Sequence, residues 1–129
     1  MLERYWRTVS GGLFLEFPLV SKSPTNSARY LDGLIVPDFA EQMWQWSEAK
    51  NQGLTPDLVE GKNIIVVQAK YKPKRLCMPL LGQTLFAAEL LKKLRPASVR
   101  GVALCRQDDS ALREAFENFP NMEVVVDDA

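Results

Sequence analysis

The chain has 129 residues, of which 47% are hydrophobic and 25% charged, and its 16 basic residues balance its 16 acidic ones. This length suits one domain covering residues 1–129, and the composition excludes an intrinsically disordered chain. No apolar run approaches the roughly 20 residues of a membrane span, and no signal-peptide core opens the sequence, so we expect a cytoplasmic protein without a membrane partner.

The first part of the chain predicts a short helix and a β-hairpin. Residues 2–9 read as a helix that stops before two glycines. The apolar segments LFLEFPLV (13–20) and ARYLDGLIVP (28–37) are typical of strands. The turn-forming segment SKSPTNS (21–27) joins them, so the three segments predict a hairpin.

A second helix is predicted for DFAEQMWQWSEAKNQG (38–53). Asp38 suits its N-cap, Glu41 follows three residues later, and Gly53 stands just after its end. This helix would separate the hairpin from the rest of the sheet.

The remaining chain alternates strands and helices. We expect strands at IIVVQAKY (64–71), 98–106 and 122–127, and helices at 77–95 and 109–119. A hairpin followed by β-α-β-α-β implies a central mixed sheet with helices on its faces. The predicted fold class is therefore α/β, a three-layer sandwich.

The chain contains no histidine. This excludes histidine general-base catalysis, Ser–His and Cys–His nucleophiles, and imidazole metal sites. Any metal must be held mainly by oxygen, which favours Mg²⁺, Mn²⁺ or Ca²⁺ over zinc.

Three polar side chains interrupt otherwise apolar strands. Gln68 and Lys70 are two residues apart at the end of a strand, so they point to the same face. Asp32 is flanked by apolar residues, where a carboxylate is costly unless it is paired or bound to metal. If the two strands are neighbours, a carboxylate, an amide oxygen and an ammonium meet. Such a group suits phosphodiester hydrolysis with a hard cation.

These residues resemble the PD-(D/E)XK nuclease superfamily: Asp32, a strand ending Gln68-x-Lys70, and a following helix that opens with Gln83. The resemblance covers essentially the whole chain. It implies the restriction-endonuclease-like core α-β-β-β-α-β, here with a helical insertion at 38–53. It further implies that Asp32, Gln68 and Lys70 are catalytic and that Mg²⁺ (or Mn²⁺) is the cofactor. Gln68 stands where the family usually has an acid.

The resemblance also implies a further acid at the metal. Glu3, on the first helix, matches by position, and Glu16, on the first strand, is the rival. We assign the metal ligands as Glu3, Asp32 and Gln68 and keep Glu16 as the alternative to Glu3.

A basic strip follows the motif. KYKPKR (70–75) holds four cations and no acid, and such strips bind phosphates without reading sequence. We expect Lys72, Lys74, Arg75 and the helix residue Gln83 to contact nucleic acid.

The resemblance thus implies a metal-dependent nuclease that hydrolyses DNA phosphodiester bonds, and a chain of this size would grip DNA as a homodimer. The alternative is a non-catalytic nucleic-acid-binding or assembly module of the same fold, in which Gln68 marks lost activity.

Overall fold

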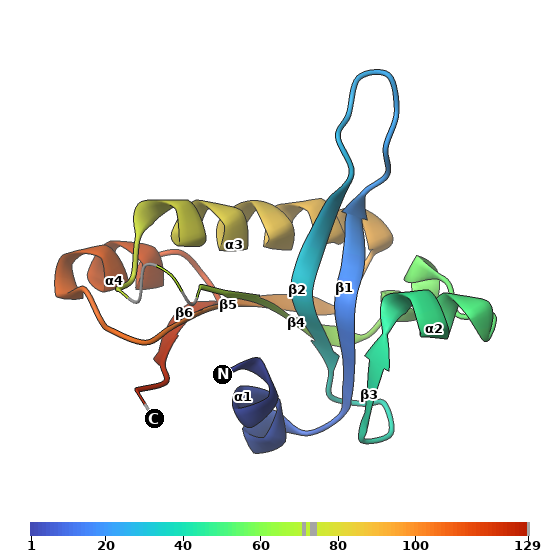
Figure 1. The fold of residues 1–129 in the computed structure, drawn as a ribbon, viewed down its shortest axis with the longest axis horizontal. Coiled ribbons are helices and arrows are strands. Elements are labelled where there is room, and N and C mark those ends of the chain that lie inside the picture. The colour runs from blue at the N-terminus through green and yellow to red at the C-terminus, as the bar shows by residue number, and fades with distance from the viewer. Residues whose placement is uncertain (71, 73–74, 129) are drawn as a thin grey trace.

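Figure 1 shows the fold in a computed structural model of the chain, which describes residues 1–70, 72 and 75–128. The described residues form six β-strands and four α-helices. In chain order these are α1 (Leu2–Val9), β1 (Gly12–Val20), β2 (Arg29–Val36), β3 (Gln42–Gln45), α2 (Trp46–Asn51), β4 (Asn63–Ala69), α3 (Met78–Leu91), β5 (Ser98–Cys105), α4 (Ser110–Glu117) and β6 (Met122–Val126). Short 3-10 helices occupy Pro56–Val59 and Lys92–Leu94.

The strands build one mixed sheet in the order β3-β1-β2-β4-β5-β6. β1 and β2 form an antiparallel hairpin, and β2 pairs antiparallel with β4. The pairs β4–β5 and β5–β6 are parallel, and α3 and α4 connect their strands. A βαβαβ unit therefore extends a hairpin, as the sequence predicts.

Helices cover both faces of this sheet. α1 lies against one face, where Trp6 packs with Leu13, Ile35 and Val67. α3 and α4 lie across the other face (Figure 1). α3 packs mainly on β5 and β4 and buries Ala87, Ala88 and Leu91 in the core. This layering agrees with the predicted α/β sandwich and its mixed sheet.

The close approach of α1 depends on Gly33. A Cβ atom at this position would lie 2.9 Å from both Cδ atoms of Leu2. The missing side chain therefore lets α1 pack on the strand that carries Asp32. A salt bridge of 2.9 Å between Arg4 and Asp127 joins α1 to the segment after β6.

The helix predicted for 38–53 is wrong. Its first part contains a turn at Asp38 and the edge strand β3, and the helix α2 begins only at Trp46. β3 pairs in parallel with residues 12–15 of β1, and Trp44 stacks on Phe14 with ring centroids 6.5 Å apart. Pairing with a distant strand and aromatic packing thus override the local helix signals.

The other predicted elements exist, with shifted ends. β4 ends at Ala69, so Lys70 lies just beyond the strand. α3 ends at Leu91 and passes into a 3-10 turn, which shortens the helix predicted for 77–95. α4 begins after Asp109, whose side chain accepts a hydrogen bond from Leu112 N–H as an N-cap. Among the described residues, no helix combines the length and apolarity that crossing a membrane requires.

Candidate active-site groove

The ladder between β2 and β4 stops where the polar residues begin. Its paired residues are Ile35 with Ile65, Leu34 with Val66, and Gly33 with Val67. Asp32 and Gln68 come next in this register, but they are not joined by the regular ladder. β4 continues alongside β5 as far as Ala69, which pairs with Leu104. The two strands therefore part at Asp32 and open a site between them.

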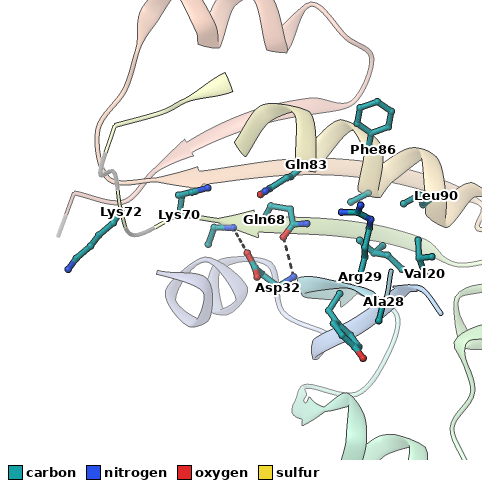
Figure 2. Close-up of a pocket in the computed structure, with 14 residues that line it drawn as sticks. Val20, Ala28, Arg29, Asp32, Gln68, Lys70, Lys72, Gln83, Phe86 and Leu90 are labelled. Atoms are coloured by element: carbon teal, nitrogen blue, oxygen red, sulfur yellow. Dashed lines mark hydrogen bonds between the residues drawn. The ribbon is translucent and has the colours of Figure 1, made fainter. Parts of the chain in front are cut away.

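Two hydrogen bonds from side chain to main chain bridge this opening. Asp32 N–H donates to Gln68 Oε1 at 3.2 Å, and Ala69 N–H donates to Asp32 Oδ2 at 2.9 Å (Figure 2). A side-chain oxygen of β4 thus accepts from a main-chain N–H of β2, and a side-chain oxygen of β2 accepts from a main-chain N–H of β4. The bonds hold the Asp32 carboxylate and the Gln68 amide in fixed positions.

The register of the β1–β2 hairpin places a second acid beside Asp32. In the β1–β2 ladder, Leu15 pairs with Gly33 and Phe17 with Leu31, so Glu16 falls opposite Asp32. Glu16 has a left-handed backbone with φ 55°, which is costly for a residue other than glycine. Two like charges on opposed positions destabilise a hairpin unless a cation lies between them.

A groove with a volume of about 1110 Å³ runs over this opening. Its floor is the end of β4, with Gln68, Ala69, Lys70 and the later residue Lys72. One wall is the β1–β2 hairpin, which projects beyond the sheet (Figure 1). The other wall is α3. The hairpin contributes Leu19, Val20, Ala28, Arg29, Tyr30 and Asp32. α3 contributes Gln83, Phe86, Ala87 and Leu90.

The helix wall follows from the helical repeat. Residues 83, 86, 87 and 90 are spaced i, i+3, i+4 and i+7 and therefore share one face of α3. Ala87 is buried in the core beneath, whereas Gln83 and Phe86 are exposed. α3 thus fixes an amide and an aromatic ring beside the ends of β2 and β4 (Figure 2).

Burial in the groove raises the pKa of Asp32 above its usual value of 3.8. The hydrogen bond from Ala69 and the charge of Lys70 oppose this rise, while the charge of Glu16 adds to it. Burial therefore disfavours the charged form of the carboxyl group, and a bound cation would offset that cost.

We predict that Asp32→Asn makes the metal-free protein more stable at neutral pH. A carboxyl group whose pKa is raised by folding contributes stability below pH 3.8, and that contribution is lost as the pH rises through the folded-state pKa. The free energy of unfolding of the variant should therefore exceed that of wild type by an amount that grows from pH 3 to pH 7. Urea unfolding in EDTA measures it, with Asp38→Asn on an exposed turn as the control. An advantage that is constant with pH would contradict the prediction.

The structure brings most of the predicted site residues together. Asp32, Gln68, Lys70, Lys72 and Gln83 all line the groove. Asp32 and Lys70 are close enough for the lysine to lower the pKa of the carboxyl group.

Two predicted residues, Glu3 and Arg75, are not among the described residues that line the groove, and a third, Lys74, lies outside the described part of the chain. Glu3 forms a salt bridge of 2.8 Å with Arg7 on α1 and is not among the lining residues. Arg75 pairs with Gln107 in a short bridge beside β5. Neither of the two acids proposed to join Asp32 is among the lining residues, but Glu16 is the cross-strand neighbour of Asp32, whereas Glu3 pairs with Arg7.

Sequence reasoning missed Arg29, Tyr30 and Phe86 in the groove lining. Tyr30 is two residues from Asp32 on a strand, and Phe86 is three from Gln83 on a helix. Strand and helix periodicity, counted from Asp32 and Gln83, could therefore have found both aromatic residues.

The oxygen donors beside Asp32 fit a divalent cation such as Mg²⁺ or Mn²⁺. Within the described part of the chain, Asp32 Oδ1 accepts no hydrogen bond, and Gln68 Oε1 accepts a single one. The described residues contain no group of three or more acidic, cysteine or histidine side chains placed to share a metal. Mg²⁺ in proteins is commonly held by one or two carboxylates and several waters, which is what this site offers.

No family model, curated protein or solved structure matches the chain. The geometry of the groove is therefore what points to a function for the chain.

Proposed function

We propose that the groove is the active site of a metal-dependent nuclease that hydrolyses DNA phosphodiester bonds. The observation that carries the proposal is the meeting of Asp32, Gln68 and Lys70 at one parting of two strands. These groups are the carboxylate of the exposed Asp32, the amide of the buried Gln68 and an ammonium, and the groove that holds them is open to solvent.

The strand arrangement supports the restriction-endonuclease-like core. α1 precedes the β1–β2 hairpin, β4 adds to that hairpin in antiparallel fashion, and α3 leads to the parallel strand β5. We assign β1, β2, β4 and β5 to the core and treat β3 and α2 as the insertion. This order is α-β-β-β-α-β, the one that the resemblance implies.

Each residue has a distinct role in the proposed reaction. Asp32 would hold the cation through Oδ1, with Gln68 and Glu16 as the further oxygen donors. When bound, the cation lowers the pKa of a water molecule and neutralises charge on the phosphate. Lys70 stabilises the negative charge that builds on the phosphate oxygens as the bond breaks. Arg29 and Lys72 bind phosphates on either side along the groove.

A non-catalytic module of the same fold is the second candidate. Two observations favour it: an amide stands at position 68, and its oxygen already accepts a hydrogen bond from Asp32 N–H. Such a module would bind nucleic acid through the same cations without holding metal.

Calorimetry with Mn²⁺ and a cleavage assay separate the two candidates. The nuclease should bind Mn²⁺ and cleave a supercoiled plasmid or a single-stranded circular DNA, and Asp32→Asn should lose both properties. A wild-type protein that binds no Mn²⁺ and cleaves neither DNA would favour the module.

Two glutamate variants make the test specific to the groove. Glu16→Gln should weaken Mn²⁺ binding, because Glu16 lies opposite Asp32 and its charge acts on that carboxylate. Glu3→Gln removes the same charge on α1, where Glu3 pairs with Arg7, and should leave Mn²⁺ binding intact. If Glu3→Gln weakened Mn²⁺ binding and Glu16→Gln did not, Glu3 would be the metal ligand in place of Glu16.

A further inference from the structure

Two aromatic side chains in the groove remain exposed. Tyr30 on the hairpin wall is 61% exposed, and Phe86 on the helix wall is 72% exposed. Neither takes part in the aromatic ring contacts among the described residues, which gather around Phe14. Exposed aromatic rings beside a functional groove usually mark a surface that a ligand covers.

Cations accompany these rings. Among the described residues that line the groove, Arg29, Lys70 and Lys72 are basic and Asp32 is the one acid. Among the described residues, none of the three cations forms a salt bridge with an acid. The hairpin adds Lys22 and has no acid between Glu16 and Asp32. The described lining therefore carries net positive charge beside flat apolar surfaces.

We infer that the groove binds a single-stranded stretch of nucleic acid, with unpaired bases stacked on Tyr30 and Phe86. This inference rests on the proposed function, because it names the substrate class of the same site. Cations that follow the backbone and aromatic rings that stack on bases are the two features of single-strand binding sites. In a duplex the base faces are covered by neighbouring bases, so two separate rings could not reach them.

The charge distinguishes this ligand from an apolar protein partner. A hydrophobic helix or peptide would cover Tyr30 and Phe86 but would bring no counter-charges for Arg29 and Lys72. A polynucleotide supplies phosphates for the cations and flat bases for the rings at a regular spacing along one chain.

Fluorescence anisotropy in EDTA tests the inference without cleavage. Wild-type protein is titrated into a labelled single-stranded oligonucleotide, into its blunt duplex, and into an abasic strand of the same length. The single strand should bind about tenfold or more tightly than the other two, because only its bases can stack. A duplex or abasic strand that binds equally well would overturn the inference.

Variants assign the effect to the two rings. Tyr30→Ala and Phe86→Ala should each weaken single-strand binding at least about fivefold and leave duplex binding nearly unchanged. Tyr30→Phe should bind like wild type, and Phe86→Leu should behave like the alanine variant. Phe119→Ala is the matched control, since Phe119 is 51% exposed but lies outside the groove. If Phe86→Leu bound the single strand as tightly as wild type, Phe86 would make an apolar contact and would not stack on a base.

The outcome is separable from that of the nuclease proposal. Single-strand binding that depends on both rings would support the inference even if the protein cleaved no DNA with any metal. Metal-dependent cleavage with no effect of either ring would overturn the inference and leave the nuclease proposal standing.

Discussion

Lys70→Ala is expected to slow metal-dependent cleavage by about a hundred- to a thousandfold, the usual effect of losing one group that stabilises transition-state charge. Lys70 lines the groove next to Gln68 and lies close enough to act on the Asp32 carboxyl group. Its ammonium would be needed when negative charge builds on the phosphate, and it would contribute less to binding of the intact strand. Single-turnover rates on a labelled strand, at saturating Mn²⁺, measure the loss.

Lys72→Ala provides the matched control for this result. Lys72 lines the same groove but lies beyond the parting of β2 and β4. We expect weaker DNA binding at moderate salt and a nearly normal single-turnover rate at saturating protein. Equal rate losses in the two lysine variants would show that Lys70 acts only as a phosphate contact. Calorimetry with Mn²⁺ should give unchanged affinity for Lys72→Ala and higher affinity for Lys70→Ala, which removes a positive charge that acts on the Asp32 carboxyl group.

Gln68→Glu is expected to raise Mn²⁺ affinity about tenfold or more, the effect of one added charge near a divalent ion. A glutamate oxygen can still accept the hydrogen bond that Asp32 N–H donates to Gln68 Oε1. The second carboxylate beside Asp32 should also raise the pKa of Asp32 further in the metal-free protein. Isothermal calorimetry measures the affinity, and the cleavage rate at low Mn²⁺ should rise with it.

Gln68→Ala is the companion variant. It removes the acceptor for Asp32 N–H, and an unsatisfied part-buried donor costs about 1–3 kcal/mol. We expect lower stability, weaker Mn²⁺ binding and little cleavage. If Gln68→Glu left Mn²⁺ affinity at the wild-type value, Gln68 would have no contact with the metal, and the proposed donor set would lose its second oxygen.

Local patterns predicted most of the fold. The apolar, β-branched segments became β1, β2, β4, β5 and β6, because such runs bury well in a sheet wherever it is built. The helix prediction for 38–53 was wrong because β3 forms by pairing with the first half of β1, which is distant in the sequence. Trp44 then gains its stacking partner Phe14 from that distant strand.

The sequence by itself predicted that Gln68 and Lys70 lie together where a strand ends, because side chains two apart share a face of a strand; both line the groove, although β4 ends at Ala69. It also determined that Asp32 is an unusual acid among apolar neighbours. Only the tertiary structure decided which acid lies beside Asp32. The β1–β2 register sets Glu16 opposite it, and the packing of α1 gives Glu3 a partner in Arg7. Periodicity is a property of the local backbone, whereas register and helix docking come from contacts between distant segments, which no short stretch of sequence contains.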